Sequence, residues 1–434
     1  MHTRIYYTFW ITIYSLNNVI QKGKAVARSV ESPSLLRGRM AGGQNSVFWQ
    51  NYIILSFQHS AFMGDSSSQQ KKVAGRNVFL LGVVSFLNDM SSEIILPILP
   101  FFLRGFGAGY TGIGIVGGLI DGFGNLVKVF SGYISDRIGN RKHMVFSGYL
   151  ISQISKLALS FSGSTAVAGL FVTLDRVGKG IRTSPRDALL AESGMKSGKA
   201  FGFHRMMDTL GAVLGTSFSL LLVYMGFQYK NAIFMAAAIG FFAVIPLIFV
   251  TETAHPVKKP KITFRLKKFT LFSFFVGLAN ISYMFFMLRA EILGVQTAIG
   301  FYLVFNITYA LLSYPFGIIA EKIGKPRSLA AGYIFMTLAS LLMFYGETFH
   351  ILLSGFVMYG LFMSVVEAQQ RAFASDLSTS YGFGIGTYHF VFGISTIIGN
   401  VVAGVIADIS LTLVFAYSAL MSFIAAICYT LLRF

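Results

Sequence analysis

The sequence predicts an all-α membrane protein with twelve transmembrane helices arranged as two pseudo-symmetric six-helix bundles. Three observations predict this fold. The 434 residues are 54% hydrophobic and only 12% charged, about half the charged fraction of a soluble domain. The apolar residues form long runs separated by short polar segments. A set of charged, glycine and histidine residues also recurs at a fixed offset of 185 positions, which indicates an internal repeat.

The first 75 residues are predicted to be a poorly ordered N-terminal extension outside this fold. Their two apolar runs, 5–14 and 47–57, are shorter than the roughly 20 residues that cross a bilayer core. The first run has no small-residue cleavage site, which argues against a signal peptide. An interfacial helix, or a stretch read ahead of a start near Met63, stays open as an alternative.

Apolar runs long enough to span a membrane begin at residue 77. The twelve predicted spans are 77–103, 111–135, 143–162, 165–186, 200–225, 230–250, 269–289, 296–320, 328–346, 349–371, 382–406 and 411–432. A basic segment with two prolines, 255–268, separates the sixth span from the seventh. We therefore predict an N-terminal bundle at 76–254, a cytoplasmic linker at 255–268 and a C-terminal bundle at 269–434.

The basic residues fall almost entirely on one side of the predicted spans. If the segment before the first span is cytoplasmic, twenty Lys and Arg lie in inner connections and three in outer ones. This bias places both termini in the cytoplasm of a multi-pass protein of the cell membrane. It also accounts for the net charge of +18 without a nucleic-acid partner.

Seven residues match like for like across the 185-residue offset. The pairs are Gly132 and Gly317, Asp136 and Glu321, Arg137 and Lys322, Gly139 and Gly324, Lys142 and Arg327, Arg186 and Arg371, and His204 and His389. Two parallel six-helix repeats are the pattern of one large class of secondary transporters.

The loop after the second span carries a recognisable motif. The segment 132–142, GYISDRIGNRK, resembles the signature loop G-x-x-x-D-R-x-G-R-R/K of the major facilitator superfamily, and 317–325 is a degenerate second copy. The resemblance covers about 76–434 and implies that superfamily's fold and a gating role for these loops. The residues so implied are Gly132, Asp136, Arg137, Gly139, Arg141, Gly317, Glu321, Lys322 and Gly324.

Two interpretations of that loop stand side by side. A glycine lets two helices approach closely, and Asp136 could meet the positive N-terminus of the helix that begins near Tyr381. Such a contact would hold the halves together on the inner side and break when the protein opens inward. Alternatively, the basic residues Arg141 and Lys142 only enforce topology.

The fourth and fifth spans refine the resemblance. Arg176 and Gly180 match an R-x-x-x-G pattern of many proton-coupled members, and the stretch 175–188, which contains D-R-x-G-K-G-I-R, resembles a prokaryotic group within the superfamily. In the fifth span Gly211 and Gly215 are followed by Thr216, where drug/proton antiporters often carry proline. This difference counts against a drug-efflux assignment.

Ionisable residues within the spans indicate a polar cavity, because such groups cost several kcal/mol in lipid unless paired or hydrated. Asp89 and Glu93 lie four residues apart, hence on one helical face, and their mutual repulsion favours one of them holding a proton. The alternative is that both form structural ion pairs with Arg176 or Lys179. The full set predicted for ion coupling or substrate binding is Asp89, Glu93, Asp121, Lys128, Asp175, Arg176, Lys179, Arg182, His204, Arg205, Asp208, Asn280, Glu367, Arg371 and His389.

These residues are concentrated in the first half, and we expect mainly neutral polar contacts from the second. His389 is either a group that titrates near neutrality or a hydrogen-bonded packing residue. The Tyr and Phe stripes are interpreted as lipid-facing or packing residues.

The predicted function is secondary active transport of a small polar organic solute, coupled to protons and carried out by a monomer in the lipid bilayer. The Arg and Lys of the fourth span mildly favour an anionic solute. The sequence has one cysteine, Cys428, no Gly-rich phosphate loop and no metal-ligand cluster, so we expect no enzyme activity, cofactor or metal. The alternatives are a proton-driven multidrug or metabolite efflux antiporter and, from a different class, a non-transporting membrane sensor.

Overall fold

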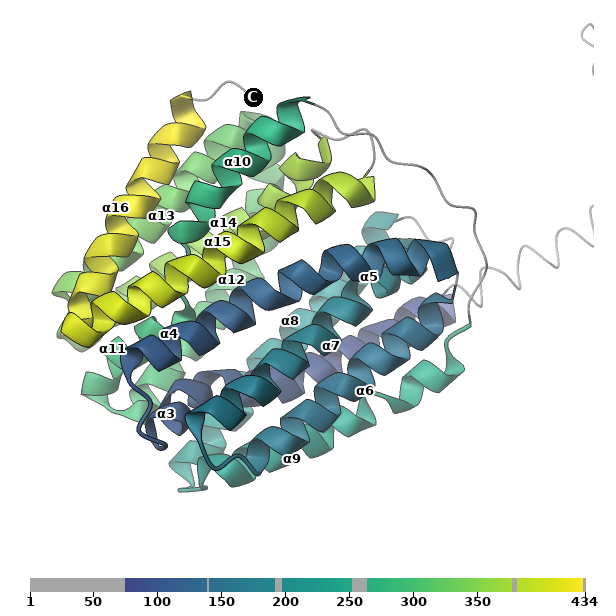
Figure 1. The fold of residues 1–434 in the computed structure, drawn as a ribbon, viewed down its shortest axis with the longest axis horizontal. Coiled ribbons are helices and arrows are strands. Elements are labelled where there is room, and N and C mark those ends of the chain that lie inside the picture. The colour runs from purple at the N-terminus through teal and green to yellow at the C-terminus, as the bar shows by residue number, and fades with distance from the viewer. Residues whose placement is uncertain (1–74, 139, 192–196, 252–263, 377–380, 432–434) are drawn as a thin grey trace, which may run out of the picture. The chain divides into compact units, whose positions relative to one another are not determined.

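The computed structural model describes residues 75–138, 140–191, 197–251, 264–376 and 381–431. The predicted extension up to residue 74 and the predicted linker up to residue 263 lie outside these residues. Within the described ranges the regular structure is helical throughout and contains no strand, which confirms the predicted all-α fold class (Figure 1).

The described part before residue 252, here called the N-terminal half, begins with a helical span over Gly75–Arg104. The span contains a short 3₁₀ turn, η2 (Leu96–Ile98), before α3 (Leu99–Arg104). Pro97 and Pro100 lie at these two starts, where a missing backbone N–H costs least. The elements that follow are α4 (Tyr110–Gly118), η3 (Leu119–Phe123), α5 (Gly124–Ile138), α6 (Arg141–Ser160), α7 (Thr165–Ala191), α8 (Ser197–Tyr224), α9 (Tyr229–Phe242) and η4 (Ile245–Phe249).

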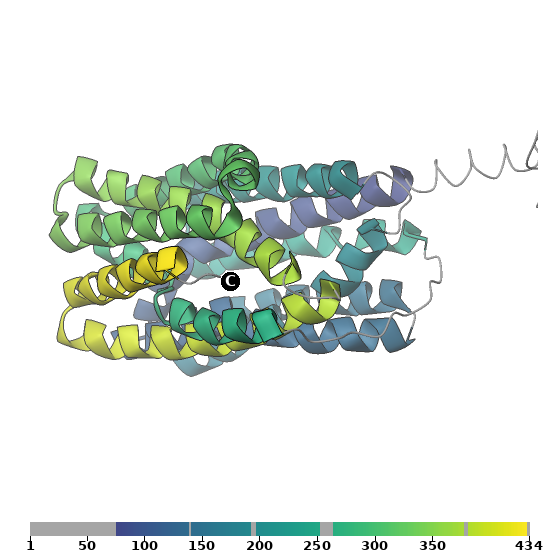
Figure 2. The same cartoon turned by 90° about the horizontal axis from the view of Figure 1, so that it is seen from above.

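The described part from residue 264 onward, here called the C-terminal half, holds the remaining helices. They are α10 (Phe264–Leu278), α11 (Tyr283–Ala290), η5 (Glu291–Leu293), α12 (Val295–Ile323), α13 (Lys325–Tyr345), α14 (Phe349–Asp376), α15 (Tyr381–Ile409) and α16 (Leu411–Leu431). Its helices α12, α13, α14 and α16 pack against one another, as α6, α7 and α9 do in the N-terminal half. Seen from above, the helices of both halves run roughly along one direction (Figure 2).

Ten helices of the described residues are long and apolar enough to cross a membrane. The other two predicted spans correspond to α6 and α7, which are long helices but carry Lys156, Asp175, Arg176, Lys179 and Arg182. The predicted count of twelve spans therefore stays a prediction, because these two helices would cross only with their charges turned inward.

Helices from the two halves meet along α15, which packs against α4, η3 and α5, and along the contact between α8 and α12 (Figure 1). Glycine permits the closest approaches. A Cβ at Gly114 would collide with the Asn400 carbonyl oxygen, and one at Gly122 with the Gly393 carbonyl oxygen. The motif glycines do not lie at such close approaches. A Cβ at Gly132 would lie 3.5 Å from Ser184, and a Cβ at Gly317 would have no neighbour within 4 Å.

The second span contains a π-helical turn, η3, between α4 and α5. A π turn inserts an extra residue into a helix, and such turns are common at functional sites. Asp121 lies inside this turn, and Asn125 donates to the Asp121 carbonyl oxygen at 2.9 Å. The turn therefore sets where Asp121 points.

Two polar contacts join the halves at the end of the molecule that carries the N-terminus of α4. Arg104 Nη1 lies 2.8 Å from Glu291 Oε2. The Asp408 carboxylate accepts from the backbone N–H of Tyr110 at 2.9 Å and of Thr111 at 3.3 Å, which satisfies two N–H groups that have no partner within the helix. This end of the molecule is the one predicted to face outward.

Candidate functional site

A cavity of about 340 Å³ is lined by residues of both halves. Eleven of the predicted site residues line it, namely Asp89, Glu93, Asp121, Lys128, Arg176, Lys179, Arg205, Asp208, Asn280, Glu367 and His389. Asp175, Arg182 and His204 are buried but are not among the lining residues. The Arg371 side chain lies outside the described residues.

The two halves contribute different chemistry to the cavity wall. Eight of its ionisable residues belong to the N-terminal half: Asp89, Glu93, Asp121, Lys128, Arg176, Lys179, Arg205 and Asp208. The described residues of the C-terminal half contribute Glu367 and His389. No described residue of the N-terminal half places an aromatic ring on the wall. The C-terminal half instead supplies nine aromatic rings, namely Tyr283, Tyr302, Phe305, Tyr309, Tyr333, Tyr359, Phe362, Tyr388 and Phe392. We call these surfaces the ionic face and the aromatic face.

Asp89 and Glu93 are held by neutral donors. Asp89 Oδ1 accepts from the Asn88 amide at 3.1 Å. Glu93 Oε2 accepts from Asn306 Nδ2 at 3.2 Å and from the Thr216 hydroxyl at 3.5 Å. Among the described residues neither carboxylate has a basic group within ion-pair distance. Neither carboxylate therefore forms a direct ion pair with Arg176 or Lys179 in this structure.

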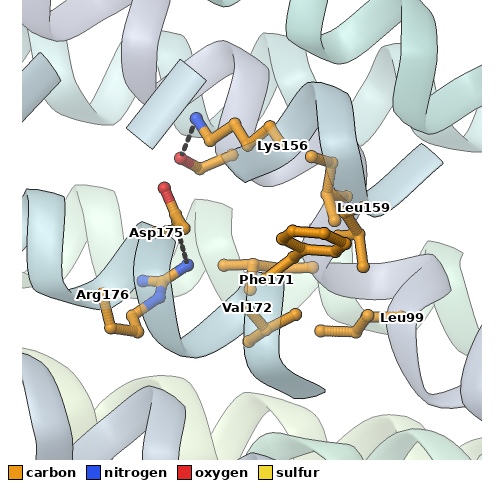
Figure 3. A pocket seen from close by; sticks show the side chains of 10 residues that line it. Leu99, Lys156, Leu159, Phe171, Val172, Asp175 and Arg176 are labelled. Carbon is orange, nitrogen blue, oxygen red and sulfur yellow. Dashed lines mark hydrogen bonds and ion pairs between the residues drawn. The ribbon is translucent and has the colours of Figure 1, made fainter. Parts of the chain in front are cut away.

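Arg176 instead pairs with Asp175, at 3.0 Å between Nη2 and Oδ2. Both side chains are more than nine-tenths buried, and Figure 3 shows the pair beside a small pocket whose other walls are Leu99, Leu159 and Val172. Arg182 is held elsewhere: its Nη1 donates to Ser152 Oγ at 2.5 Å, and its guanidinium lies 4.2 Å from the centre of the Tyr149 ring.

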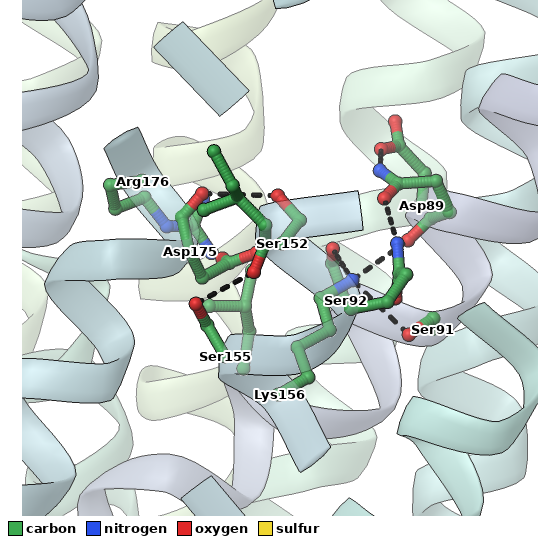
Figure 4. A network of polar contacts seen from close by, with 12 residues as sticks. Asp89, Ser91, Ser92, Ser152, Ser155, Lys156, Asp175 and Arg176 are labelled. Atoms are coloured by element: carbon green, nitrogen blue, oxygen red, sulfur yellow. Dashed lines mark hydrogen bonds and ion pairs between the residues drawn. The ribbon is translucent and has the colours of Figure 1, made fainter. Parts of the chain in front are cut away.

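Lys156 of α6 was not among the predicted site residues, yet it anchors the turn that carries the two carboxylates. It is 2% exposed, and its Nζ donates to Ser92 Oγ at 2.9 Å, to Ser91 Oγ at 3.1 Å and to the Asn88 carbonyl oxygen at 3.4 Å (Figure 4). One turn earlier, Gln153 Nε2 donates to Asn88 Oδ1 at 3.0 Å. The sequence does contain a signal for this role, because Lys156 is a lysine within the otherwise weakly charged run 143–162.

Two further ion pairs involve residues of the cavity wall. His204 Nδ1 lies 3.3 Å from Asp208 Oδ2, and Ser85 also bonds Asp208. Arg205 Nη2 lies 3.3 Å from Glu367 Oε2 across the halves, and its guanidinium lies 5.0 Å from the centre of the Tyr309 ring. Tyr309 itself donates to Glu367.

The remaining predicted cavity residues are engaged locally. Lys128 Nζ donates to Asn125 Oδ1 at 2.9 Å. Asn280 accepts through its carbonyl oxygen from Asn400 Nδ2 at 3.1 Å. His389 is buried at the cavity wall.

The motif loops are described only in part. The side chains of Asp136 and Arg137, and all of Gly139, lie outside the described residues, as do the side chains of 381–387. The proposed contact between Asp136 and the helix start at Tyr381 thus stays a prediction. In the second copy Glu321 and Lys322 are exposed, and Gly324 adopts φ +91° where α12 ends, a conformation that favours glycine.

The aromatic face was missed. The sequence predicts lipid-facing or packing residues at these positions. Seven of the nine rings are indeed buried in the packed core, but all nine also line the cavity, which the sequence does not predict. No composition signal separates them, because Phe and Tyr account for 44 and 20 residues of the chain. Only the packing of α11, α12, α13, α14 and α15 brings them to one surface.

Comparisons with known proteins agree with the fold. The family model described as Major Facilitator Superfamily matches residues 81–303 and 269–434. An uncharacterised MFS-type transporter of Methanocaldococcus jannaschii is 40% identical over 382 residues, which is 83% of this chain and 96% of that protein. Among solved structures, the nucleoside transporter NupG aligns with TM-score 0.70 at 15% identity over 81% of this chain and 98% of that one. The peptide transporter POT aligns with TM-score 0.66 at 14% identity over 83% and 97%.

Proposed function

Because the chain belongs to the Major Facilitator Superfamily and is a multi-pass membrane protein, we propose that it is a proton-coupled secondary active transporter. It moves a small polar organic solute by alternating access to the cavity between its halves. The observation that carries the proposal is the pair of cavity carboxylates, Asp89 and Glu93, which lie one helical turn apart with no basic partner among the described residues.

Proton uptake at this pair is linked to the contact between halves. Glu93 Oε2 accepts from Asn306, which also donates to Thr216 at 2.9 Å, so one oxygen of the N-terminal half is tied to an amide of the C-terminal half. A proton on Glu93 removes the negative charge that makes this hydrogen bond strong. Loading the proton therefore loosens a contact between halves, and the fixed charge of Arg176 in the same cavity favours its release.

Closure at one end supports alternating access. The Arg104–Glu291 pair and the Asp408 contact with α4 hold the halves together at the predicted outer end. We propose that these contacts break when the protein opens outward, while the loops at 132–142 and 317–325 gate the inner end. The proposal includes bundles at 76–254 and 269–434, joined by the basic segment 255–268, with both termini in the cytoplasm and a monomer in the cell membrane.

Uptake into proteoliposomes tests the coupling. We expect Asp89→Asn and Glu93→Gln each to lower pH-gradient-driven transport by about tenfold or more, because the neutral side chains cannot exchange a proton. Exchange of labelled against unlabelled solute, which needs no net proton movement, should survive. Asp187→Asn is the matched control, since Asp187 pairs with Arg186 and does not line the cavity. Gradient-driven transport that persists in both cavity variants would refute the coupling role.

Efflux by proton antiport is the second candidate, and the aromatic face favours it because such walls accept varied apolar groups. Expression of the chain in a drug-susceptible bacterial host separates the two. Raised resistance with lowered accumulation of a compound indicates export, and faster accumulation indicates import.

A further inference from the structure

We propose that the transported solute carries a planar ring with an amide-like edge, and that the side chain of Asn280 recognises this edge at a break in the seventh span. The inference rests on the proposed function, because it takes the cavity to be the transport site. An amide-like edge is a hydrogen-bond donor beside an acceptor, as in aromatic carboxamides and lactams. The cavity of about 340 Å³ falls within the range of roughly 300–1,000 Å³ typical of small-molecule pockets.

The helix of the seventh span is interrupted at the cavity. The span covers Phe269–Leu293, but α10 ends at Leu278 and α11 begins only at Tyr283. Residues 279–282 between them are not helical. Backbone that leaves the helix within a membrane is tolerated where protein satisfies its polar groups or where it lines a cavity, and broken helices of transporters form solute sites in this way. The break is therefore a candidate binding element.

Side chains of two neighbouring helices satisfy the backbone groups that the break leaves open. Asn400 of α15 donates to the Asn280 carbonyl oxygen at 3.1 Å and accepts from the Ser282 backbone N–H at 2.6 Å. From α16, Tyr417 and Ser418 donate to the carbonyl oxygens of the two residues before Asn280, at 2.9 and 3.4 Å. The break is thus a supported part of the fold, and it gives Asn280 a fixed place in the cavity wall.

The side-chain amide of Asn280 is open to a solute. Asn125, Asn306 and Gln370 also line the cavity, and each of their amides makes at least two hydrogen bonds within the protein. Asn280 is half-buried at the wall, and among the described residues only its backbone forms hydrogen bonds. Because a side-chain amide has a donor and an acceptor side by side, it can bind a complementary edge through two hydrogen bonds.

The ring of the solute is placed against Phe392. Seven of the nine rings of the aromatic face are buried, whereas Tyr309 and Phe392 are half-buried. Tyr309 is occupied, because the Arg205 guanidinium lies over its ring at 5.0 Å. Phe392 packs beside the seventh span: its carbonyl oxygen would lie 3.1 Å from a Cβ at Gly277, three residues before Asn280. An accessible ring and an open amide are therefore neighbours on the cavity wall.

Stacking favours a planar ring over an aliphatic one at this position. The centroid of the Phe392 ring lies 5.4 Å from that of Tyr388, and the Tyr388 ring stacks in turn on Phe269 at 5.7 Å. The cavity-lining ring is thereby held from behind. A flat ring added at its open face extends this stack, whereas a puckered ring gains apolar contact alone.

Equilibrium binding to the purified full chain in detergent tests the proposal with three uncharged probes. Benzamide has the ring and the amide edge, N,N-dimethylbenzamide lacks the donors of that edge, and cyclohexanecarboxamide keeps the edge on a puckered ring. Thermal shift against concentration gives each Kd. We expect benzamide to bind about three- to tenfold more tightly than each of the other two, as one lost hydrogen bond or one lost ring stack predicts.

Each contrary outcome overturns a stated part. Equal binding of N,N-dimethylbenzamide overturns the amide edge, and equal binding of cyclohexanecarboxamide overturns the planar ring. Absence of stabilisation by benzamide and by the lactam 2-pyridone overturns both. Binding is measured without a gradient, so these results leave proton-coupled transport standing. Conversely, benzamide that binds but is not moved across proteoliposomes by a pH gradient of either direction counts against the transport proposal alone.

Asn280→Leu tests the amide. The variant loses no side-chain hydrogen bond within the described residues, so the unfolding midpoint of the ligand-free protein should change little. Benzamide should bind about five- to tenfold more weakly, and N,N-dimethylbenzamide about threefold more weakly at most, because that probe keeps only the acceptor. Asn231→Leu is the control, since Asn231 is exposed on α9 and does not line the cavity. Unchanged benzamide affinity in a stable Asn280→Leu protein overturns the role of Asn280.

Phe392→Leu tests the place of the ring. It keeps an apolar side chain and removes the stack, so benzamide should bind about three- to tenfold more weakly while cyclohexanecarboxamide stays within about twofold. Phe390→Leu on the same helix is the control, because Phe390 is 39% exposed and does not line the cavity. Equal losses for benzamide and cyclohexanecarboxamide, or no loss for either, overturn the stack on Phe392.

Discussion

The ionic face and the aromatic face of the cavity are stabilised in different ways. The ionic face depends on support from behind, where Lys156, Gln153 and Asn88 hold the turn that carries Asp89 and Glu93. The aromatic face supports itself, because its rings pack directly on one another. Charged groups in a low-dielectric interior need partners, and rings need only contact. One half is therefore organised by a buried polar network and the other by packing.

In the proposed proton-coupled transporter, this difference separates two tasks. The ionic face would exchange protons, and the aromatic face would contact apolar parts of the solute. Contacts that bridge the faces among the described residues include Asn306 with Glu93 and Arg205 with Glu367. Substitutions of the residues behind the ionic face, of Asn306 and of the Arg205–Glu367 pair should accordingly differ in how strongly they lower transport.

The largest effect is expected where α6 crosses α7 behind the ionic face. A Cβ at Gly178 would lie 2.6 Å from the Gly148 carbonyl oxygen and 2.7 Å from Ser152 Oγ. Gly178→Ala should force these helices apart and destabilise the protein by about 1–3 kcal/mol, with loss of transport because α7 carries Arg176 and Lys179. Gly202→Ala is the control, since nothing lies within 4 Å of that Cβ. Thermal unfolding in detergent measures both, and equal midpoints would contradict the close crossing.

Next in size is Lys156→Met, which fills the space but removes three hydrogen bonds from the first span. Removing this buried donor leaves three buried acceptors without it, so the protein should be destabilised by about 1–3 kcal/mol and the unfolding midpoint should fall. Transport should also fall about tenfold, because Ser91, Ser92 and the Asn88 carbonyl oxygen lose the donor that positions Asp89 and Glu93. Normal uptake by a stable Lys156→Met variant would show that the ionic face does not need this anchor.

The bridge at Asn306 should affect transport about as strongly as Lys156. Asn306→Leu removes the amide that bonds both Glu93 and Thr216, and a hydrogen bond to a charged group corresponds to roughly a tenfold loss of gradient-driven transport. Thr308→Val on the same helix is the control, because its hydroxyl bonds only the Val304 carbonyl oxygen at 2.8 Å. If both variants transport equally well, the hydrogen bond between halves has no part in coupling.

The smallest effect is expected at the half-exposed Arg205–Glu367 pair of the cavity wall. Its side chains are 44% and 36% exposed, and solvent screens such pairs to about 1 kcal/mol or less. Arg205→Glu and Glu367→Arg should each lower transport no more than about fivefold, and the double exchange should recover part of the loss. A double variant worse than both single variants would mean that these side chains act through other partners.

The sequence predicted the ionic face better than the aromatic face for a physical reason. An ionisable residue within an apolar span is costly enough to stand out by itself, so Asp89, Glu93, Asp121 and Lys179 could be identified one at a time. Tyr302 or Phe305 costs nothing in lipid, so its position says little about which way it faces. The aromatic face exists only through the packing of five helices.

Some charged residues and the motif glycines show where spacing along the sequence no longer predicts the position of a side chain in the fold. Asp175 and Arg182 carry the same signal as Lys179, yet neither lines the cavity: Asp175 is buried against Arg176, and Arg182 donates to Ser152 of α6. The rotation of the helix decides between cavity and interior. The motif glycines, Gly132 and Gly317, were expected at close helix contacts, but such contacts occur at Gly114, Gly122 and Gly178. A motif marks a loop, whereas helix crossings depend on which residues oppose each other in space.

The π turn at Leu119–Phe123 has a consequence for how this cavity can change. The turn holds one residue more than an α-helix needs, so a single codon is enough to create it or to erase it. Deleting one residue there would restore regular α-helical hydrogen bonding, and the residues after the turn would keep their orientation, because the π turn absorbs the extra residue. Asn125 and Lys128 would stay at the cavity wall, whereas Asp121 would lose the wide turn that positions it. One insertion or deletion can therefore change the position of a single cavity carboxylate while the rest of the helix keeps its place.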